Sequence, residues 1–283
     1  MTPRALLLQA AKEFREAGIP DPESDASLLL SHLCGKPPLS LRLDTDTELP
    51  AFLADSFRAL AARRLRREPL QYIIREASFC GRTFHVDPRV LIPRPETELL
   101  CRWAFELPLS PGMKVLDLCC GSGCIGLTLA AGRPDLRVTL SDISRDALDV
   151  AALNASRLGL HPEMLLSDLT SSVPGGSFDL IVSNPPYIPS AECRILQPEV
   201  LCEPVLALDG GTDGLGVYRK IAADAARVLR ENGMLLMELG YGEAVPVRNL
   251  LESHGYTSVE TRKDLNGIDR MILAHNVPRR PHD

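Results

Sequence analysis

The spacing of apolar residues divides the sequence into two parts. In the first 75 residues apolar side chains recur at helical spacing, as in segment 49–67, where Phe52, Phe57 and Leu60 are predicted to share one face. From residue 112 onward, short apolar runs alternate with helical stretches, and these runs are 113–118, 136–141, 178–183, 234–239, 256–261 and 271–274. Alternation of this kind predicts an α/β domain with a mostly parallel sheet and helices on both faces.

A third segment connects these two parts. Residues 77–84 have the pattern of a β-hairpin that turns at Gly81, and Pro93-Arg94-Pro95 is a typical start for a helix at Glu96. We therefore predict a small helical domain at residues 1–75, a β-hairpin linker at residues 76–92 and an α/β domain at residues 93–283.

Composition and charge narrow the classes of partner. The 283 residues carry a net charge of −6, which argues against a protein held directly to nucleic acid by phosphate contacts. No apolar run approaches the ~18 residues that a membrane span needs, and the run at residues 5–8 is too short for a secretory signal. We expect a cytoplasmic monomer without a membrane or direct nucleic-acid partner.

The cysteines and the basic residues have simple interpretations. The eight cysteines include no C-x-x-C pair and the histidines do not cluster near them, so we expect no metal site and predict reduced, mostly buried thiols. Four arginines crowd the end of the 49–67 helix, namely Arg63, Arg64, Arg66 and Arg67. A solvated helix C-terminus explains them most simply, and a contact with an acidic partner is the alternative.

A glycine-bearing turn follows the first strand of the predicted sheet. Its residues are Cys119, Cys120, Gly121, Ser122 and Gly123, and Gly126 completes a G-x-G-x-x-G pattern. Asp142 ends the second strand, where a carboxylate can accept both hydroxyl protons of a ribose. The motif alone fits a nicotinamide or flavin dinucleotide, or another adenosine-bearing cofactor.

Asp117 distinguishes these cofactors. It stands inside the first strand just before the turn, where a carboxylate suits a cationic ligand better than a pyrophosphate. S-adenosylmethionine has such a cation in its sulfonium, together with an amino group. The alternative is a carboxylate that bonds only local backbone N–H groups.

The segment Asn184-Pro185-Pro186-Tyr187 follows the apolar strand 178–183. Pro185 keeps Asn184 out of helical geometry, and neither proline donates a hydrogen bond, so the turn is stiff and rich in acceptors. The Asn184 side-chain oxygen and the Pro185 carbonyl match the two N–H bonds of a planar –NH2 group, and Tyr187 offers an aromatic face for that plane. An ordinary proline-rich turn is the alternative.

These residues resemble the class I methyltransferases that modify –NH2 nitrogens of adenine, cytosine or glutamine. Nearly the whole chain is similar to one branch, the release factor glutamine methyltransferases. The stretches that carry this closer resemblance are Glu68-Pro69-Leu70-Gln71-Tyr72, Leu91-Ile92-Pro93-Arg94-Pro95-Glu96-Thr97-Glu98, Glu203-Pro204, Ala207-Leu208-Asp209-Gly210-Gly211 and Asp213-Gly214-Leu215.

The resemblance implies a Rossmann-like, seven-stranded catalytic domain that methylates the glutamine N5 nitrogen in the Gly-Gly-Gln motif of class I peptide chain release factors. It implies S-adenosylmethionine around residues 117–123, Asp142, Asp168, Leu169 and Asn184, and the acceptor glutamine at Asn184 through Tyr187. Asn184, Pro185 and Tyr187 are the expected catalytic residues. Two residues depart from the family pattern, since Cys119 and Arg75 each stand where glycine is usual.

Two other functions remain open at this point. A nucleic-acid amino methyltransferase of the N6-adenine type uses the same turn, but it needs a basic recognition surface that this acidic chain does not suggest. A nicotinamide-dependent oxidoreductase shares the glycine turn, but it gives no reason for the Asn184–Tyr187 segment.

Overall fold

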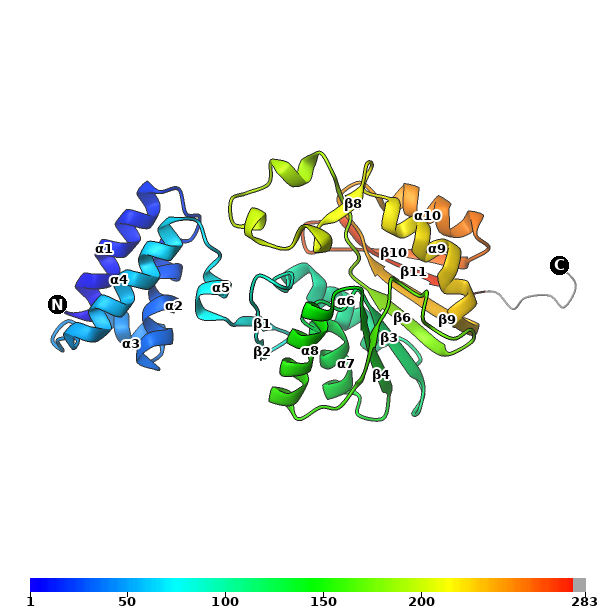
Figure 1. The fold of residues 1–283 in the computed structure, drawn as a ribbon, viewed down its shortest axis with the longest axis horizontal. Coiled ribbons are helices and arrows are strands. Elements are labelled where there is room, and N and C mark those ends of the chain that lie inside the picture. The colour runs from blue at the N-terminus through cyan, green and yellow to red at the C-terminus, as the bar shows by residue number, and fades with distance from the viewer. Residues whose placement is uncertain (277–283) are drawn as a thin grey trace, which may run out of the picture. The chain divides into compact units, whose positions relative to one another are not determined.

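The computed structural model describes residues 1–276, which fall into two compact units (Figure 1). The first unit comprises residues 1–76 together with residues 197–202, and the second comprises residues 77–196 and those from 203 onward. The predicted linker hairpin therefore lies in the second unit, and a short segment from the C-terminal part of the sequence packs with the N-terminal helices.

The first unit is helical, as the spacing predicted. Its elements are α1 (Pro3–Glu16), α2 (Pro22–Cys34), α3 (Pro38–Leu43), α4 (Ala51–Leu65), α5 (Leu70–Ile74) and the 3-10 helix η2 (Val200–Cys202). Phe14, Leu29 and Phe57 belong to its shared core. Phe52 is 68% exposed, so its predicted place beside Phe57 is wrong. Five residues of an α-helix turn through about 140°, which puts these two rings on different faces.

The arginines at the end of α4 include two that are not solvated. Arg64 is 4% exposed, and its guanidinium donates to Asp25 Oδ2 and Glu199 Oε1, each at 2.8 Å. Arg67 donates to the two Glu199 oxygens at 2.7 and 2.8 Å. Burial alone would raise the pKa of Glu199, but Arg67 and Arg64 lower it to about 2. The solvated interpretation is therefore wrong for Arg64 and Arg67, because an acidic residue distant in sequence supplies their counter-charge.

A seven-stranded sheet forms the centre of the second unit. Its strands are β3 (Lys114–Leu118), β4 (Arg137–Asp142), β5 (Glu163–Leu166), β6 (Phe178–Ser183), β9 (Leu229–Glu238), β10 (Thr257–Lys263) and β11 (Asp269–His275). They lie in the order β10-β11-β9-β6-β3-β4-β5, and only the pairings of β11 with β9 and β10 are antiparallel within this sheet of the described chain. The mostly parallel sheet is confirmed. The apolar runs did not reveal β5, because its side chains are at best half-buried at the sheet edge.

Helices cover both faces of this sheet (Figure 1). Their bounds are α6 (Pro95–Glu106), α7 (Cys124–Gly132), α8 (Arg145–Leu158), α9 (Gly216–Val228) and α10 (Ala244–Ser253). The first three share one core through Leu100, Leu127 and Leu148. The last two share the other core through Ile221 and Leu251. The predicted doubly covered α/β architecture is confirmed.

Smaller elements complete the second unit. They are the strands β1 (Ala77–Phe79), β2 (Arg82–Phe84), β7 (Ile188–Pro189) and β8 (Asp209–Gly211), with the 3-10 helices η1 (Glu192–Arg194) and η3 (Val205–Ala207). β1 and β2 form the predicted hairpin around Gly81, and β7 pairs with β8. Cys101, Cys120, Cys124 and Cys193 are buried free thiols, as predicted, whereas Cys202 is exposed. Within residues 1–276, no helix combines the length and apolar character needed to cross a bilayer.

Candidate active site

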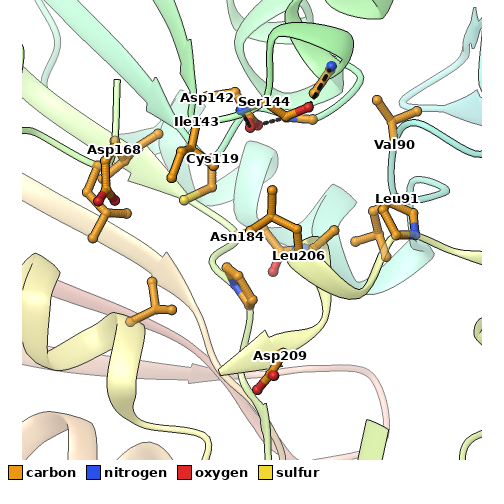
Figure 2. Close-up of a pocket in the computed structure, with 18 of the residues that line it drawn as sticks. Val90, Leu91, Cys119, Asp142, Ile143, Ser144, Asp168, Asn184, Leu206 and Asp209 are labelled. Atoms are coloured by element: carbon orange, nitrogen blue, oxygen red, sulfur yellow. Dashed lines mark hydrogen bonds between the residues drawn. The ribbon is translucent and has the colours of Figure 1, made fainter. Parts of the chain in front are cut away.

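A cavity of about 320 Å³ lies where β3, β4 and β6 end (Figure 2). Open α/β sheets bind ligands at this edge, and the volume falls in the range of small-molecule sites. The predicted site residues that line it are Cys119, Gly121, Asp142, Asp168, Leu169, Asn184 and Pro186. The predicted site residues outside its lining are Asp117, Cys120, Ser122, Gly123, Pro185 and Tyr187. The fold thus brings the glycine turn and the Asn184 turn to one cavity.

Two backbone N–H groups hold the Asp142 carboxylate at the cavity wall. Gly121 N–H donates to Oδ2 and Ser144 N–H donates to Oδ1, each at 2.9 Å (Figure 2). Burial raises the pKa of Asp142, and these N–H groups oppose that rise. Each oxygen keeps a second lone pair, so the carboxylate can accept the two hydroxyl protons of a ribose. The residues present therefore fit the nucleoside part of S-adenosylmethionine.

Asp117 lies behind the cavity wall. Its side chain is fully buried, and Oδ2 accepts Gly126 N–H at 2.7 Å. Oδ1 has no hydrogen-bond partner among residues 1–276. Burial raises the pKa of Asp117 to about 7. A bond to local backbone, the alternative that the sequence left open, describes the contact it makes, and a role toward a cationic ligand stays a prediction.

Gly126 is needed where α7 approaches this carboxyl group. A Cβ at this position would lie 2.3 Å from Leu140 Cδ2 and 2.9 Å from Asp117 Oδ2. The third glycine of the motif thus serves close packing between helix and strand, and it leaves the Gly126 N–H beside Asp117.

The two departures from the family pattern share one backbone conformation. Cys119 has φ +61° and Arg75 has φ +58°, both in the left-handed region that favours glycine. Cys119 lies directly after β3 and lines the cavity, whereas Arg75 ends α5 and is exposed. Burial raises the pKa of the Cys119 thiol well above its usual range, so the thiol is a neutral part of the wall. The chain keeps the turn that glycine would make in both places.

The Asn184 side chain is bonded from behind. Its Nδ2 donates to Thr97 Oγ1 at 3.2 Å, and the Thr97 hydroxyl donates to Glu238 Oε2 at 2.7 Å. The Tyr187 hydroxyl donates to Glu238 Oε1 at 3.4 Å. Burial raises the pKa of Glu238 to about 7, while the Thr97 hydroxyl and the charge of Arg270 oppose that rise. The expected stacking of the Tyr187 ring on a substrate stays a prediction.

Three stretches that carried the family resemblance meet around the Asn184 turn. Thr97 bonds Asn184, as described above. Glu203 accepts Ile92 N–H at 2.9 Å and also accepts from the Arg94 guanidinium. β8 pairs with β7 so closely that a Cβ on Gly210 would lie 2.7 Å from Tyr187 Cα. The separate motifs therefore build one wall around Asn184.

Thr97 and Glu238 are the polar partners that sequence reasoning missed. Thr97 lies in a stretch noted for its resemblance, but nothing local assigns it a role. Glu238 is a lone carboxylate in a strand whose neighbours are apolar, and it is 1% exposed. The same signal directed attention to Asp117 in β3, so it could have found Glu238 in β9. Groups of three or more potential metal ligands do not occur within residues 1–276.

Comparisons with known proteins agree with this geometry. Residues 5–74 match the family profile described as PrmC N-terminal domain, and residues 97–203 match the methyltransferase small domain. A release factor glutamine methyltransferase of Chlorobaculum tepidum is 44% identical over 270 residues, which cover 91% of each chain. One from Cereibacter sphaeroides is 43% identical over 271 residues, covering 95% of this chain and 96% of that protein.

A solved structure supports the fold. The crystal structure of a methyltransferase from Pyrococcus furiosus covers 71% of this chain and 92% of its own, with a TM-score of 0.54 and 18% identity. At that identity the likeness concerns the fold alone, whereas the two relatives above match over nearly the full length at more than 40% identity. The chain belongs to the release factor glutamine methyltransferase family.

Proposed function

We propose that this protein transfers a methyl group from S-adenosylmethionine to the side-chain amide nitrogen of the glutamine in the Gly-Gly-Gln motif of class I release factors. One observation carries the proposal: Asn184 lines the same cavity as Asp142. A group suited to an –NH2 acceptor and a group suited to a ribose thus face a shared space. Family membership supports the same assignment.

The chemistry asks the protein mainly for placement. An amide nitrogen is a weak nucleophile because its lone pair is delocalised into the carbonyl, and its protons are too weakly acidic for a side-chain base to remove first. S-adenosylmethionine, when bound, supplies an electrophilic methyl group. Asn184 Oδ1 and the Pro185 carbonyl accept the two N–H bonds and aim the nitrogen, and accurate orientation contributes up to ~7–11 kcal/mol.

The same two acceptors act on charge. As the new N–C bond forms, positive charge grows on the amide nitrogen, and the nitrogen releases one proton to water afterwards. Acceptor dipoles aimed at that nitrogen stabilise the growing charge without reorganisation. No catalytic Cys, His or Ser is required by this scheme.

The helical unit is the proposed recognition domain for the body of the release factor. Its five N-terminal helices form their own core, separate from the two cores around the sheet. A domain of this kind favours a folded protein substrate over a short peptide. We therefore expect a lower KM for an intact release factor than for a peptide that contains only the Gly-Gly-Gln loop.

The deciding experiment supplies methyl-labelled S-adenosylmethionine with several acceptors in separate reactions. The acceptors are an intact release factor, the same factor with the motif glutamine changed to alanine, a loop peptide, DNA and RNA. We expect one methyl group on the intact factor, none on the alanine variant, and a higher KM for the peptide. Label on DNA or RNA would favour the nucleic-acid amino methyltransferase. Equal KM values for factor and peptide would remove the recognition role of the helical unit.

A further inference from the structure

The hydrogen bonds behind Asn184 have a fixed direction. A threonine hydroxyl has one proton, and Thr97 donates it to Glu238 Oε2 at 2.7 Å. Towards Asn184 the Thr97 oxygen can then only accept, and it does so from Nδ2 at 3.2 Å. An amide presents its NH2 and its oxygen at opposite ends, so the nitrogen bonded to Thr97 leaves Oδ1 for the cavity side.

Glu238 is itself held in place. It ends β9 with 1% exposure, and the Tyr187 hydroxyl donates to its Oε1 at 3.4 Å. The Tyr218 hydroxyl donates to the backbone carbonyl of the same residue at 2.9 Å. Buried carboxylates are retained only where donors surround them. The chain of bonds from Glu238 through Thr97 to Asn184 therefore starts from a rigid acceptor.

We propose that Thr97 and Glu238 are positioning residues for methyl transfer, which hold the Asn184 amide so that its oxygen faces the acceptor nitrogen. This inference rests on the proposed function, since it assigns the orientation of the group that grips the substrate. If the amide turned over, its NH2 would face the substrate NH2, and two donors cannot pair. A purely structural threonine in the first turn of α6 would stabilise the fold without controlling this orientation.

The first test compares two substitutions at Thr97 with a matched control. Thr97→Val keeps the shape but removes the hydroxyl, so we expect kcat for the release factor to fall about tenfold, the loss typical of one hydrogen bond. Thr97→Ser keeps the hydroxyl and should restore most of kcat. The control is Thr128→Val in α7, since the buried Thr128 hydroxyl has no hydrogen-bond partner within residues 1–276. Its kcat should equal that of the wild type.

The second test separates positioning from stability. In an Asn184→Ala background, Thr97→Val should cause no further loss of kcat, because the group it orients is absent. A structural role predicts the same fractional loss in both backgrounds. The affinity for S-adenosylmethionine, measured by calorimetry on each variant, should stay within about twofold of its Thr97 parent.

A measurement on the wild-type protein does not depend on the folding of any Thr97 variant. In protein labelled with 15N-asparagine, the Asn184 side-chain NH2 signal is identified by its loss in Asn184→Ala. It should show a nuclear Overhauser contact to the Thr97 side chain. Absence of that contact would overturn the proposed orientation.

The possible outcomes are distinguishable. A wild-type enzyme that methylates no release factor would overturn the proposed function and this inference with it. A wild type that is active, with Thr97→Val equally active or equally damaging in the Asn184→Ala background, would overturn the inference alone. Loss confined to the wild-type background, with rescue by serine, supports it.

Discussion

The two ends of the cavity are held by different kinds of hydrogen bond. At the cofactor end, formed by Cys119, Gly121 and Asp142, the carboxylate is bonded by backbone N–H groups 21 and 2 residues away in sequence. At the acceptor end, formed by Asn184 with Thr97 and Glu238 behind it, side chains bond each other across 87 and 141 residues. The first end depends on local turns and the second on the assembled fold.

This difference has consequences for substitution. Backbone donors remain when a side chain is changed, so the cofactor end keeps its shape and loses only the group that was removed. Side-chain partners at the acceptor end depend on each other, so removing one leaves another unpaired. Changes at the acceptor end should therefore alter kcat, and changes at the cofactor end should alter cofactor affinity.

The largest expected effect is at Asn184. Asn184→Ala removes one of the two acceptors for the substrate –NH2, which can then rotate away from the methyl group. Loss of such a positioned group typically lowers kcat ~10²–10³-fold, which single-turnover methylation at saturating cofactor measures. The exposed residue Asn266 provides a matched control, and Asn266→Ala should keep the wild-type rate. If Asn184→Ala keeps most of the rate, or if its cofactor affinity falls as far as kcat, the two ends are not separate.

The same difference explains what the sequence could predict. The glycine turn and Asp142 were identified from spacing, because their contacts lie within one strand-turn-helix segment and the next strand. The Asn184 turn was identified because prolines and an asparagine act locally too. The bonds from Thr97 and Glu238 were not predicted, since no local pattern says that the start of α6 and the end of β9 meet beside β6.

The sheet and the helical unit show a similar limit. Six apolar runs predicted six of the seven strands, and β5 escaped because an exposed edge strand needs few apolar residues. The arginines at the end of α4 were misinterpreted because Glu199, which neutralises Arg64 and Arg67, comes from far along the chain. Local propensity predicted the elements, whereas charge pairing required the tertiary structure.

An intermediate effect is expected at Asp142. Asp142→Ala removes the acceptor for the ribose hydroxyls, and hydrogen bonds to a charged group contribute about 1.5–3 kcal/mol, so cofactor affinity should fall roughly 10- to 100-fold. Asp142→Asn keeps one oxygen but directs an NH2 at a backbone N–H, so its loss should be smaller than that of alanine. Calorimetry with S-adenosylmethionine checks both variants, and NAD should not bind the wild type. Wild-type affinity in the alanine variant would contradict the ribose assignment.

The smallest effect is expected at Cys119, with Arg75 as the matched comparison. Both residues adopt positive φ, which costs a non-glycine residue roughly 1–2 kcal/mol, and the entropy of glycine in the unfolded chain offsets roughly 0.5–1 kcal/mol of the relief. Arg75→Gly loses no buried side chain, so its thermal midpoint should rise by about 1–3 °C.

Cys119→Gly should gain less, because the thiol packs against the core between α9 and the sheet, and burying a group of this size contributes about 1 kcal/mol. We therefore expect a midpoint within about 1 °C of the wild type. Any change in activity should appear as a change of cofactor affinity, since the thiol lines the cofactor end and no hydrogen bond joins it to Thr97 or Glu238 within residues 1–276. A fall in kcat at saturating cofactor as large as that of Thr97→Val would show that the glycine turn also orients the acceptor, and the division between local and long-range control would not hold.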